Sequence, residues 1–408
     1  MKILVVCQYY YPEPFRIHEV CEGLVQKGHE VTVLTGLPNY PMGVIPEEYR
    51  DGKRRLEEIG GVKIIRVKET PRTKGKIGLA KNYVSFVLNG SLKALTMKKD
   101  FDVIFVYQLS PILMAIPAYV AKWFAKTKKL KLYCLDLWPE SLVSLNISRD
   151  SAFFKIIKGV SKRIYNGADC IAYTSRKFED YFTKELKLKQ KNYMYIPQFA
   201  DELFSSVSCG DEAEDKSDAL NKSAQDKDKQ TLNYVFAGNV GQMQSVDTII
   251  KAASLCEDDR IRWHIVGDGF ALEECRALSQ ELNLEDKVTF YGRLPVEEMP
   301  RFYKMADAML VTLSDDKAIS YTLPGKVQSY MAAKRPILAA ADGEIPDLIK
   351  AAGCGMCAKS GDYKELAGLA VKMADSDREK MGECSRRYYE EHFSKGQHID
   401  NIEKLLKE

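Results

Sequence analysis

Residues 232–250 read LNYVFAGNVGQMQSVDTII and combine a strand, a glycine-containing loop and the start of a helix. The run LNYVFA is apolar and aromatic, which is typical of a strand buried in a parallel sheet. Gly238 follows this run directly, and the next segment has the apolar spacing of a helix. A strand followed by a loop and a helix is the repeating unit of a doubly wound α/β domain.

The same alternation occurs on both sides of this stretch. Residues 1–200 contain the strand patterns KILVVC, EVTVLT, VKIIRV, DVIFVY, KLYCLD, DCIAYT and YMYIP, with helical patterns between most of them. After residue 231 the alternation continues with IRWHIVGDG, KVTFYG, DAMLVTL and PILAA. We therefore expect an α/β fold with two Rossmann-like domains, 1–200 and 232–392. The polar segment 205–231 predicts a flexible connector or insertion, and a last helix at about 395–407, within 393–408, is expected to return to the first domain.

The composition is that of a soluble globular protein. Of its 408 residues, 45% are hydrophobic and 29% are charged. Residues 103–121 are uncharged, but Pro111 and Pro117 interrupt them and their start resembles a strand, so we predict a strand, a loop and an apolar helix rather than a membrane span. The N-terminus lacks the pattern of a signal peptide, and the scattered cysteines indicate a reduced, cytoplasmic chain. The lone C-x-x-C at Cys354 and Cys357 is either a metal or redox pair or part of a tight turn and strand.

The charge is divided unevenly along the chain. The net charge is +14 for residues 1–200 and −11 for residues 201–408. This asymmetry suggests that the first half meets an anionic surface, although two domains of different isoelectric point would show it too. Segments 70–99 and 121–131 mix lysines with apolar and aromatic residues, which suits an anionic membrane face. The alternative is a core helix with a solvated lysine face.

The loops that follow the strands are the expected ligand-binding positions. Backbone N–H groups at Gly238 and Gly241 are placed to approach a phosphate, although a plain turn would also use these glycines. Two later loops each contain a cation. Arg293 lies in a loop at the end of a strand. A Pro-Gly turn brings Lys326 to the start of a helix, where anions bind well. The P-loop pattern is excluded because Ser320 replaces its glycine and Val327 its Ser/Thr, and no G-x-G-x-x-G follows the first strand.

Six stretches taken in order resemble one enzyme family. They are GHEVTVLTGLPNYPMG, LDLWPES, FAGNVGQMQSVDTII, VGDGFALEE, FYGRLPVEEMPRFYKMADAML and LPGKVQSYMAAKRPIL. Together they are similar to the family-four retaining glycosyltransferases, in the bacterial branch that makes capsule and O-antigen polysaccharides. The resemblance covers nearly the whole chain apart from 205–231. It implies a GT-B fold, in which two Rossmann-like domains face each other across a cleft.

The resemblance also implies the reaction and its partners. The second domain would bind a nucleotide sugar, foremost a UDP-sugar, and the first domain a glycan or a polyprenyl-diphosphate-linked sugar as acceptor. The sugar would be transferred with retention of configuration and without a metal or another cofactor. We expect no nucleic-acid partner, and a lipid-linked acceptor suits a cytoplasmic protein bound peripherally to the inner face of the plasma membrane.

The family's functional positions carry over residue by residue. The resemblance implies catalytic roles for Lys326, Arg293 and Asp136. It implies donor binding by Arg16, Gly238, Asn239, Gly241, Gln242, Gln244, Gly267, Arg293, Gly325, Lys326, Val327 and Ser329. It implies acceptor binding by Asn39, Tyr40, Trp138 and Glu140.

Four positions depart from the family pattern. Asn239 and Gln244 stand where many relatives carry Arg and Lys, and Tyr321 and Ser329 stand where many carry two glutamates. We therefore expect Lys326, with Arg293, Arg16 and helix N-termini, to neutralise the donor diphosphate. Ser329 or Gln328 would contact the ribose, and the leaving phosphate itself would accept the acceptor's proton. An epimerase of the same fold and a non-catalytic sugar-nucleotide-binding protein remain as alternatives.

Overall fold

The computed structural model describes every residue except 74, 98–99, 125–128, 146, 190–191 and 206–230. The chain divides into two compact units. Unit 1 comprises residues Met1–Ile196 and His398–Glu408, and unit 2 comprises residues Pro197–Gln397. The predicted connector 205–231 lies outside the described residues except for its two end positions.

Unit 1 is built on an eight-stranded sheet in the order β3-β4-β2-β1-β5-β6-β7-β8. Its strands are β1 (Lys2–Val6), β2 (Glu30–Thr35), β3 (Leu56–Ile59), β4 (Val62–Arg66), β5 (Val103–Gln108), β6 (Leu130–Cys134), β7 (Cys170–Tyr173) and β8 (Asn192–Tyr195). All pairs are parallel except β3 with β4. The seven predicted strands are confirmed, whereas the sequence did not predict β3. That strand is a short, half-exposed edge strand with two glutamates and lacks the apolar run of a buried strand.

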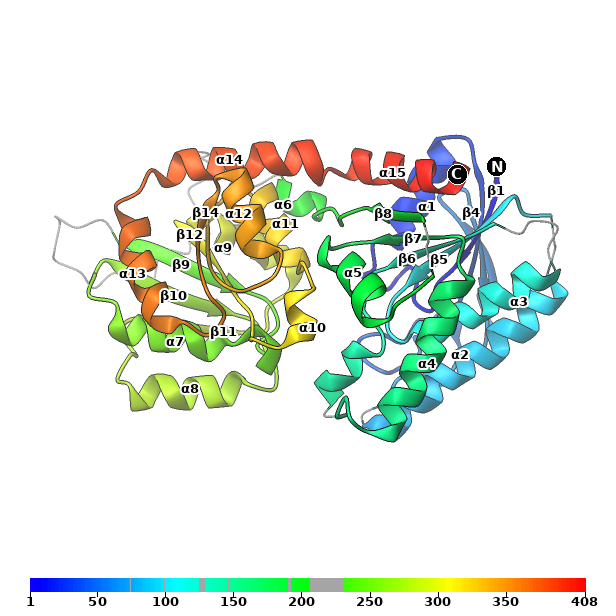
Figure 1. The fold of residues 1–408 in the computed structure, drawn as a ribbon, viewed down its shortest axis with the longest axis horizontal. Coiled ribbons are helices and arrows are strands. Elements are labelled where there is room, and N and C mark those ends of the chain that lie inside the picture. Colours follow the sequence, from blue (N-terminus) through cyan, green and yellow to red (C-terminus); the bar gives the residue numbers. More distant parts are fainter. Residues whose placement is uncertain (74, 98–99, 125–128, 146, 190–191, 206–230) are drawn as a thin grey trace. The chain divides into compact units, whose positions relative to one another are not determined.

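Helices cover both faces of this sheet (Figure 1). They are α1 (Ile17–Gln26), α2 (Lys76–Thr96), α3 (Ile116–Phe124), α4 (Ala152–Gly167) and α5 (Lys177–Asp180), with short turns η1 (Glu47–Tyr49), η2 (Ile112–Ala115), η3 (Glu140–Leu145) and η4 (Tyr181–Glu185). The uncharged stretch 103–121 forms β5, a loop, η2 and the start of α3, as predicted. In the part of the chain that the structure describes, no helix combines the length and the apolar character needed to cross a membrane.

Unit 2 contains a six-stranded, wholly parallel sheet in the order β11-β10-β9-β12-β13-β14. Its strands are β9 (Leu232–Ala237), β10 (Ile261–Val266), β11 (Val288–Gly292), β12 (Ala308–Thr312), β13 (Ile337–Ala340) and β14 (Gly355–Ala358). Its helices are α6 (Glu202–Ser205), α7 (Val246–Leu255), α8 (Leu272–Glu281), α9 (Met299–Met305), α10 (Lys317–Ser320), α11 (Gly325–Ala332), α12 (Ile345–Ala352), α13 (Tyr363–Ala374) and α14 (Arg378–His392), with turns η6 (Gln242–Gln244) and η7 (Val296–Glu298).

Each face of this second sheet has its own hydrophobic core. Tyr234 and Phe236 of β9 pack with α7 and α13, whereas Val235 and Ala237 of the same strand pack with α9, α11 and α12. Successive side chains of a strand point to opposite faces, so a continuous apolar run is what a sheet covered on both sides requires. The sequence 232–250 therefore folds as its pattern predicts.

The last helix, α15 (Lys395–Lys407), belongs mostly to unit 1. Its Ile399 fills the space that Gly23 of α1 leaves open. Its Glu403 accepts a hydrogen bond from Lys27 at 3.3 Å and pairs with the His29 ring at 2.8 Å. These contacts confirm that the C-terminal helix returns to the first domain.

Candidate functional site

The loops after β9 and β10 lie close together at the carboxyl edge of the unit 2 sheet. Gly238 donates its N–H to the Val266 carbonyl at 2.9 Å, and Val240 donates to Asp268 O at 2.9 Å. A Cβ on Gly267 would lie 1.8 Å from the Gly238 carbonyl oxygen. Both glycines have positive φ, 146° and 141°. Glycine at both positions therefore lets two backbones approach where no side chain fits.

Lys326 reaches this glycine pair from the first turn of α11. Its Nζ lies 3.7 Å from the centroid of the Phe236 ring, and a Cβ on Gly238 would lie 2.9 Å from the same atom. Nζ is buried and has no hydrogen-bond partner among the described residues. Burial lowers the pKa of Lys326 to about 7. A buried amine without a partner is costly, and such perturbed groups gather at functional sites.

A hydrogen-bonded tyrosine holds the helix that carries Lys326. Tyr330, one turn further along α11, donates its hydroxyl to the Ala237 carbonyl at 3.0 Å and accepts from the Ala237 N–H at 3.1 Å. The start of α11 is thereby fixed to the end of β9. The orientation of Lys326 toward the glycine loop follows from this attachment.

The two neutral residues expected at the positions of the family's cations are hydrogen-bonded to each other. Asn239 donates its side-chain N–H to the side-chain amide oxygen of Gln244 at 2.9 Å. The pair closes over Gly241, where a Cβ would come within 2.8 Å of both side chains. Gln242 opens the short turn η6, and Thr312 donates its hydroxyl to the Gln244 backbone carbonyl at 2.6 Å. The sequence placed these residues in one loop, but it did not show that the two amides satisfy each other.

The other predicted donor residues differ in what they can offer a ligand. Ser329 donates its hydroxyl to the Gly325 carbonyl at 3.2 Å, within its own helix. Val327 is fully buried in the core and its N–H donates to Pro324 O, so its side chain serves packing. The nearly fully buried Gln328 faces the Pro324 and Gly325 carbonyls.

Arg293 and Arg16 lie at the expected strand ends. Arg293 follows β11, is exposed, and makes no hydrogen bond or ion pair with any residue that the structure describes. It lines a shallow pocket with Leu294, Pro295, Val296 and Met299. Arg16 occupies the N-cap position of α1, in the loop after β1, and is half-buried. Both roles in donor binding remain predictions.

In unit 1, Asp136 belongs to a hydrogen-bonded chain between the ends of β5 and β6. The Ser110 hydroxyl donates to the Asp136 carboxylate at 2.8 Å and accepts from the Trp138 indole N–H at 2.7 Å. Burial raises the pKa of Asp136, although the Ser110 hydrogen bonds oppose the shift. Glu140 is employed differently, because it accepts from Arg149 at 2.7 Å and from the Tyr181 hydroxyl at 3.2 Å. Its contacts hold the loop together, and a role in acceptor binding stays a prediction.

A buried carboxyl that the sequence reasoning missed organises the loops after β1 and β2. Glu13 is 5% exposed and accepts backbone N–H groups from Tyr10 at 3.1 Å, Asn39 at 2.9 Å and Tyr40 at 2.7 Å. Burial raises the pKa of Glu13 to about 7, against the effect of the three N–H donors. Its place in YYPEPF, just after the first strand, was the available signal.

A second missed carboxyl, Glu69, lies after β4. Its Oε1 accepts amide hydrogen bonds from Gln8 at 2.6 Å and from Asn82 of α2 at 2.5 Å. Burial raises the pKa of Glu69 well above its usual value. Its Oε2 lies against Gly36, where a Cβ would leave no room for it. The amide hydrogen bonds favour the ionised form and lower the pKa, so the raised pKa of Glu69 is caused by burial.

The predicted acceptor residues Asn39 and Tyr40 lie beside these carboxyls. Asn39 is buried, and its side-chain oxygen accepts from the Arg72 N–H at 2.9 Å. Tyr40 is 36% exposed, and its ring packs against Tyr9 and Phe15. The Arg72 guanidinium lies 5.5 Å from the centre of the Tyr40 ring. Tyr40 therefore presents a supported aromatic surface, the kind of surface on which sugars stack.

Two family models match consecutive parts of the chain. The model described as "Glycosyl transferase 4-like domain" matches residues 15–198, and that described as "Glycosyl transferases group 1" matches residues 217–389. The chain belongs to the family-four, GT-B glycosyltransferases. The two matches fall on the two units and together span most of the sequence.

Curated proteins similar to this glycosyltransferase are bacterial. The probable glycosyltransferase WbjE of Pseudomonas aeruginosa is 25% identical over 323 residues, 78% of this chain and 76% of that protein. The putative colanic acid biosynthesis glycosyl transferase WcaI of Escherichia coli K12 is 23% identical over 340 residues, 81% of each chain.

Solved structures show the same fold. Sucrose-phosphate synthase of Thermosynechococcus elongatus superposes with a TM-score of 0.74 at 18% identity, covering 100% of this chain and 98% of that one. HepE of Anabaena, solved in complex with UDP, has a TM-score of 0.69 at 14% identity and full coverage of both chains. At these identities the likeness establishes the GT-B fold.

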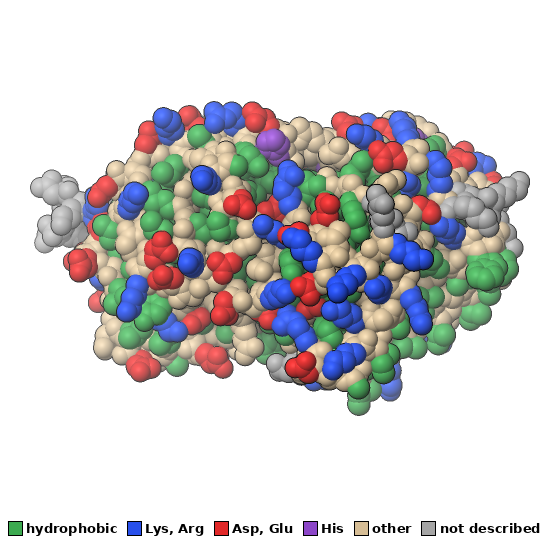
Figure 2. Space-filling model, viewed as in Figure 1, with side chains coloured by type: hydrophobic (Ala, Val, Ile, Leu, Met, Phe, Trp, Pro, Cys, Tyr) green, Lys and Arg blue, Asp and Glu red, His purple; other side chains and the backbone are tan. Residues whose placement is uncertain are grey.

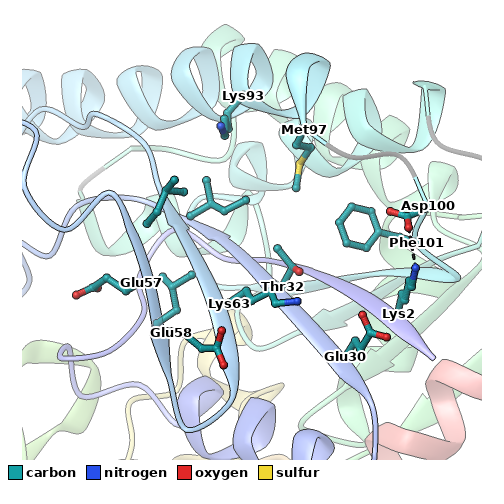
Figure 3. Close-up of a pocket in the computed structure, with 13 residues that line it drawn as sticks. Lys2, Glu30, Thr32, Glu57, Glu58, Lys63, Lys93, Met97, Asp100 and Phe101 are labelled. Carbon is teal, nitrogen blue, oxygen red and sulfur yellow. Dashed lines mark hydrogen bonds and ion pairs between the residues drawn. The ribbon is translucent and has the colours of Figure 1, made fainter.

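The glycosyltransferase has another pocket at the opposite edge of the unit 1 sheet. This cavity of about 520 Å³ opens at the amino ends of β1 and β2. In Figure 3, Lys93 of α2 and Met97, the residue after this helix, point into the cavity, while Lys2 is held by Asp100 at 2.7 Å. Since ligands of parallel α/β sheets bind at the carboxyl ends of the strands, this pocket is separate from the candidate site.

The cysteine pair of the glycosyltransferase lies within the fold of unit 2. Cys354 is buried, and Cys357 of β14 donates its thiol to the Ala341 carbonyl at 3.5 Å. Within the described residues, no three His, Cys, Asp or Glu side chains come together in a way that would hold a metal ion. Cys354 lies directly before β14 and Cys357 within it, as the alternative of a tight turn and strand predicts.

Proposed function

We propose that this glycosyltransferase moves a sugar from a UDP-sugar to a glycan or a polyprenyl-diphosphate-linked sugar during surface polysaccharide synthesis. Transfer would proceed with retention of configuration and without a metal or another cofactor. The names of its relatives support the pathway, since WcaI is assigned to colanic acid and AmsK of Erwinia amylovora to amylovoran biosynthesis. The nucleotide is supported by HepE, which was solved with UDP and with UDP-glucose.

The observation that carries the proposal is the Lys326 amine beside Gly238, which has no hydrogen-bond partner in the part of the chain that the structure describes. A bound diphosphate would raise the pKa of this amine, so that the ammonium forms as the ligand arrives. The N–H groups at the start of α11 and in the glycine loop would add fixed positive partial charge. Such preorganised donors stabilise the negative charge that develops as the sugar–phosphate bond breaks.

The chemical step requires no strong base in this proposal. A hydroxyl oxygen of the acceptor forms a bond to the anomeric carbon while the bond from that carbon to the diphosphate oxygen breaks. The leaving diphosphate takes the hydroxyl proton on the same face of the sugar, which yields retention. Asp136 and Tyr40 of unit 1 would orient the acceptor by hydrogen bonding and stacking.

A binding screen followed by a turnover assay tests the proposal. UDP is expected to raise the melting temperature more than GDP or dTDP, and calorimetry should give the same order. With a UDP-sugar, a lipid-linked acceptor and excess EDTA, the enzyme should release UDP and form a product whose anomeric configuration, read by NMR, is unchanged. Inversion, or activity abolished by EDTA, would contradict the mechanism.

The same assays separate the two alternatives. An epimerase would convert the donor sugar without any acceptor and without net release of UDP. A non-catalytic binding protein would bind UDP and turn over nothing. Absence of a thermal shift with every nucleotide would refute all three readings.

A further inference from the structure

Three neighbouring helices of unit 1, α2, α3 and α4, form a continuous outer layer (Figure 1). Gly90 of α2 lies against Pro117 of α3, where a Cβ would come within 2.9 Å of the proline ring. The Tyr119 hydroxyl of α3 donates to the Ile164 carbonyl of α4 at 2.5 Å. The outward sides of these helices therefore form one surface, here called the α2–α4 face.

Helix α2 has its large apolar side chains on the outside. Its inward side buries Asn82, Phe86, Gly90 and Ala94, at intervals of four residues. Its outward side carries Val84, Leu88, Leu92 and Leu95, which are 52%, 59%, 62% and 40% exposed. These positions are three and four residues apart and share one face. A surface helix of a globular protein normally turns its large apolar side chains toward the core and its polar side chains toward water. The outward side of α2 therefore indicates contact with an apolar surface.

The adjacent helices extend this apolar surface. Trp123 at the end of α3 is 81% exposed, and Phe153 and Ile156 of α4 are 53% and 65% exposed. Nine of the 17 large hydrophobic side chains that are exposed in the described residues lie on α2, α3 and α4. The nine are Ile77, Val84, Leu88, Leu92, Leu95, Trp123, Phe124, Phe153 and Ile156. In Figure 2, hydrophobic side chains come to the surface at the rim of unit 1 where α3 lies.

The charge on the same helices has one sign. Together α2, α3 and α4 contain eight Lys and Arg residues and no Asp or Glu. Among the described residues, Lys122 pairs with Asp169, and the other seven have no ion pair. By contrast, the exposed helix α14 of unit 2 carries four basic and four acidic residues besides His392. A protein partner could cover the apolar stripe of α2 alone. Because none of the three helices carries a carboxylate, their charge instead fits a partner with an extended negative surface.

We propose that the α2–α4 face docks this protein on an anionic phospholipid bilayer. The exposed lysines of these helices would contact the phosphate headgroups, while Val84, Leu88, Leu92 and Trp123 enter the boundary between headgroups and acyl chains. Helix α2 lies in the membrane plane in this arrangement. The inference uses outward side chains that take no part in the hydrogen bonds of the candidate site, and it stands whether or not the donor is a UDP-sugar.

Co-sedimentation of the full chain with unilamellar vesicles tests the inference. Vesicles of phosphatidylglycerol and phosphatidylethanolamine should bind the protein at low salt, and vesicles of phosphatidylcholine should bind it at least tenfold less. The double variant Leu88→Gln/Leu92→Gln should lose about tenfold in partitioning at every salt concentration. The double variant Lys155→Gln/Lys162→Gln should lose roughly 25-fold at low salt and show a weaker salt dependence.

Matched controls lie in unit 2. Leu255 is 47% exposed and Lys350 is exposed, and both lie outside the α2–α4 face. Leu255→Gln and Lys350→Gln should leave vesicle binding unchanged. All four variants change exposed residues and should keep the wild-type melting temperature and UDP affinity, so the result is independent of the proposed donor site.

Three outcomes would overturn the docking assignment. The wild-type protein would fail to bind anionic vesicles at low salt, or the control variants would lose as much binding as the face variants. Alternatively, the leucine variant would abolish self-association in sedimentation velocity without affecting vesicle binding, which would make the face a contact between two copies. Vesicle binding without UDP binding would contradict the proposed function alone.

Discussion

The carboxyl edges of the two sheets have the same architecture and opposite chemistry. In unit 2 the edge is lined with glycines, and its buried cation Lys326 lacks a hydrogen-bond partner among the described residues. In unit 1 the edge is filled by carboxyl and amide side chains, Glu13 and Glu69 among them, that hydrogen-bond to their neighbours. The Lys326 amine in unit 2 is therefore available to bind an anion. The hydrogen-bonded carboxyl groups in unit 1 hold their loops in a fixed shape. The difference supports the proposed donor site in unit 2.

Gly267→Ala should produce the largest effect. The new Cβ would lie 1.8 Å from the Gly238 carbonyl oxygen at a φ of 141°, so the two loops must separate. We expect a loss of about 3 kcal/mol or more in the free energy of unfolding, measured by urea titration. Gly368→Ala is the control, because it lies inside α13 with nothing within 4 Å and should stabilise the protein by up to about 1 kcal/mol. Equal effects at the two positions would remove the argument for close backbone contact.

Lys326→Met should weaken UDP binding while making the protein more stable. The variant loses the charged partner of the diphosphate, worth roughly 1.5–3 kcal/mol by calorimetry. It also removes a buried amine that no described residue hydrogen-bonds, so the melting temperature should rise. Lys364→Met, at an exposed lysine of α13, should change neither quantity. Unchanged UDP affinity would refute the role of Lys326 in binding the diphosphate. A lower melting temperature would refute the inference that the buried amine destabilises the fold.

The same lysine predicts a pH dependence. Its folded-state pKa of about 7 lies below the ordinary value of 10.5, so the unfolded chain binds more protons between these limits. Stability should therefore rise with pH from about 7 to 10, and Lys326→Met should flatten that rise. Because a bound diphosphate raises the pKa again, UDP binding at about pH 8 should take up nearly one proton and at about pH 6 almost none. Calorimetry in two buffers of different ionisation enthalpy measures this uptake; equal values at both pH values would contradict it.

The sequence was sufficient for the fold because the strands are apolar on both sides. Runs such as VIFVYQ in β5 and AMLVT in β12 are wholly buried, and nothing but a covered parallel sheet accommodates them. Lys326 and the glycine loop were predicted from the same local logic, since a strand end and a helix start fix where a residue lies. The edge strand β3 was not predicted, because its residues are exposed or only partly buried and so lack the apolar run of a buried strand.

The carboxyl cluster of unit 1 was missed because its partners are distant in the sequence. Glu69 bonds to Gln8, 61 residues away, and Glu13 bonds to Asn39, 26 residues away. No local pattern distinguishes a loop glutamate that will be buried from one that will be solvated. The sequence could not show that the apolar stripe of α2 is exposed. The stripe is a local pattern, but its spacing is the same whether a helix turns that face inward or outward.

Glu13→Gln and Glu69→Gln test whether the two carboxyls differ in protonation. Both oxygens of Glu13 accept N–H groups, so an amide nitrogen would face a donor and cost about 2 kcal/mol. If the raised pKa keeps Glu69 protonated at neutral pH, the acid already resembles glutamine, and Glu69→Gln should lose less than about 1 kcal/mol. The raised pKa of Glu13 also means that stability falls as pH rises from about 4.5 to 7, and Glu13→Gln should abolish that fall. Equal losses in urea titrations at neutral pH would mean that Glu69 is ionised.

Ser329→Ala should have the smallest effect and tests the ribose contact expected of Ser329. The Ser329 hydroxyl donates to the carbonyl four residues earlier, a bond that contributes little to helix stability. Stability should therefore change by less than about 0.5 kcal/mol, as for Ser254→Ala, where α7 has a comparable bond to the Lys251 carbonyl. If the hydroxyl oxygen also accepts from the ribose, UDP affinity should fall by about 1 kcal/mol while pyrophosphate affinity stays constant. Equal losses for the two ligands would assign Ser329 to positioning the start of α11, and no loss for either would leave the ribose to be held by groups outside this helix.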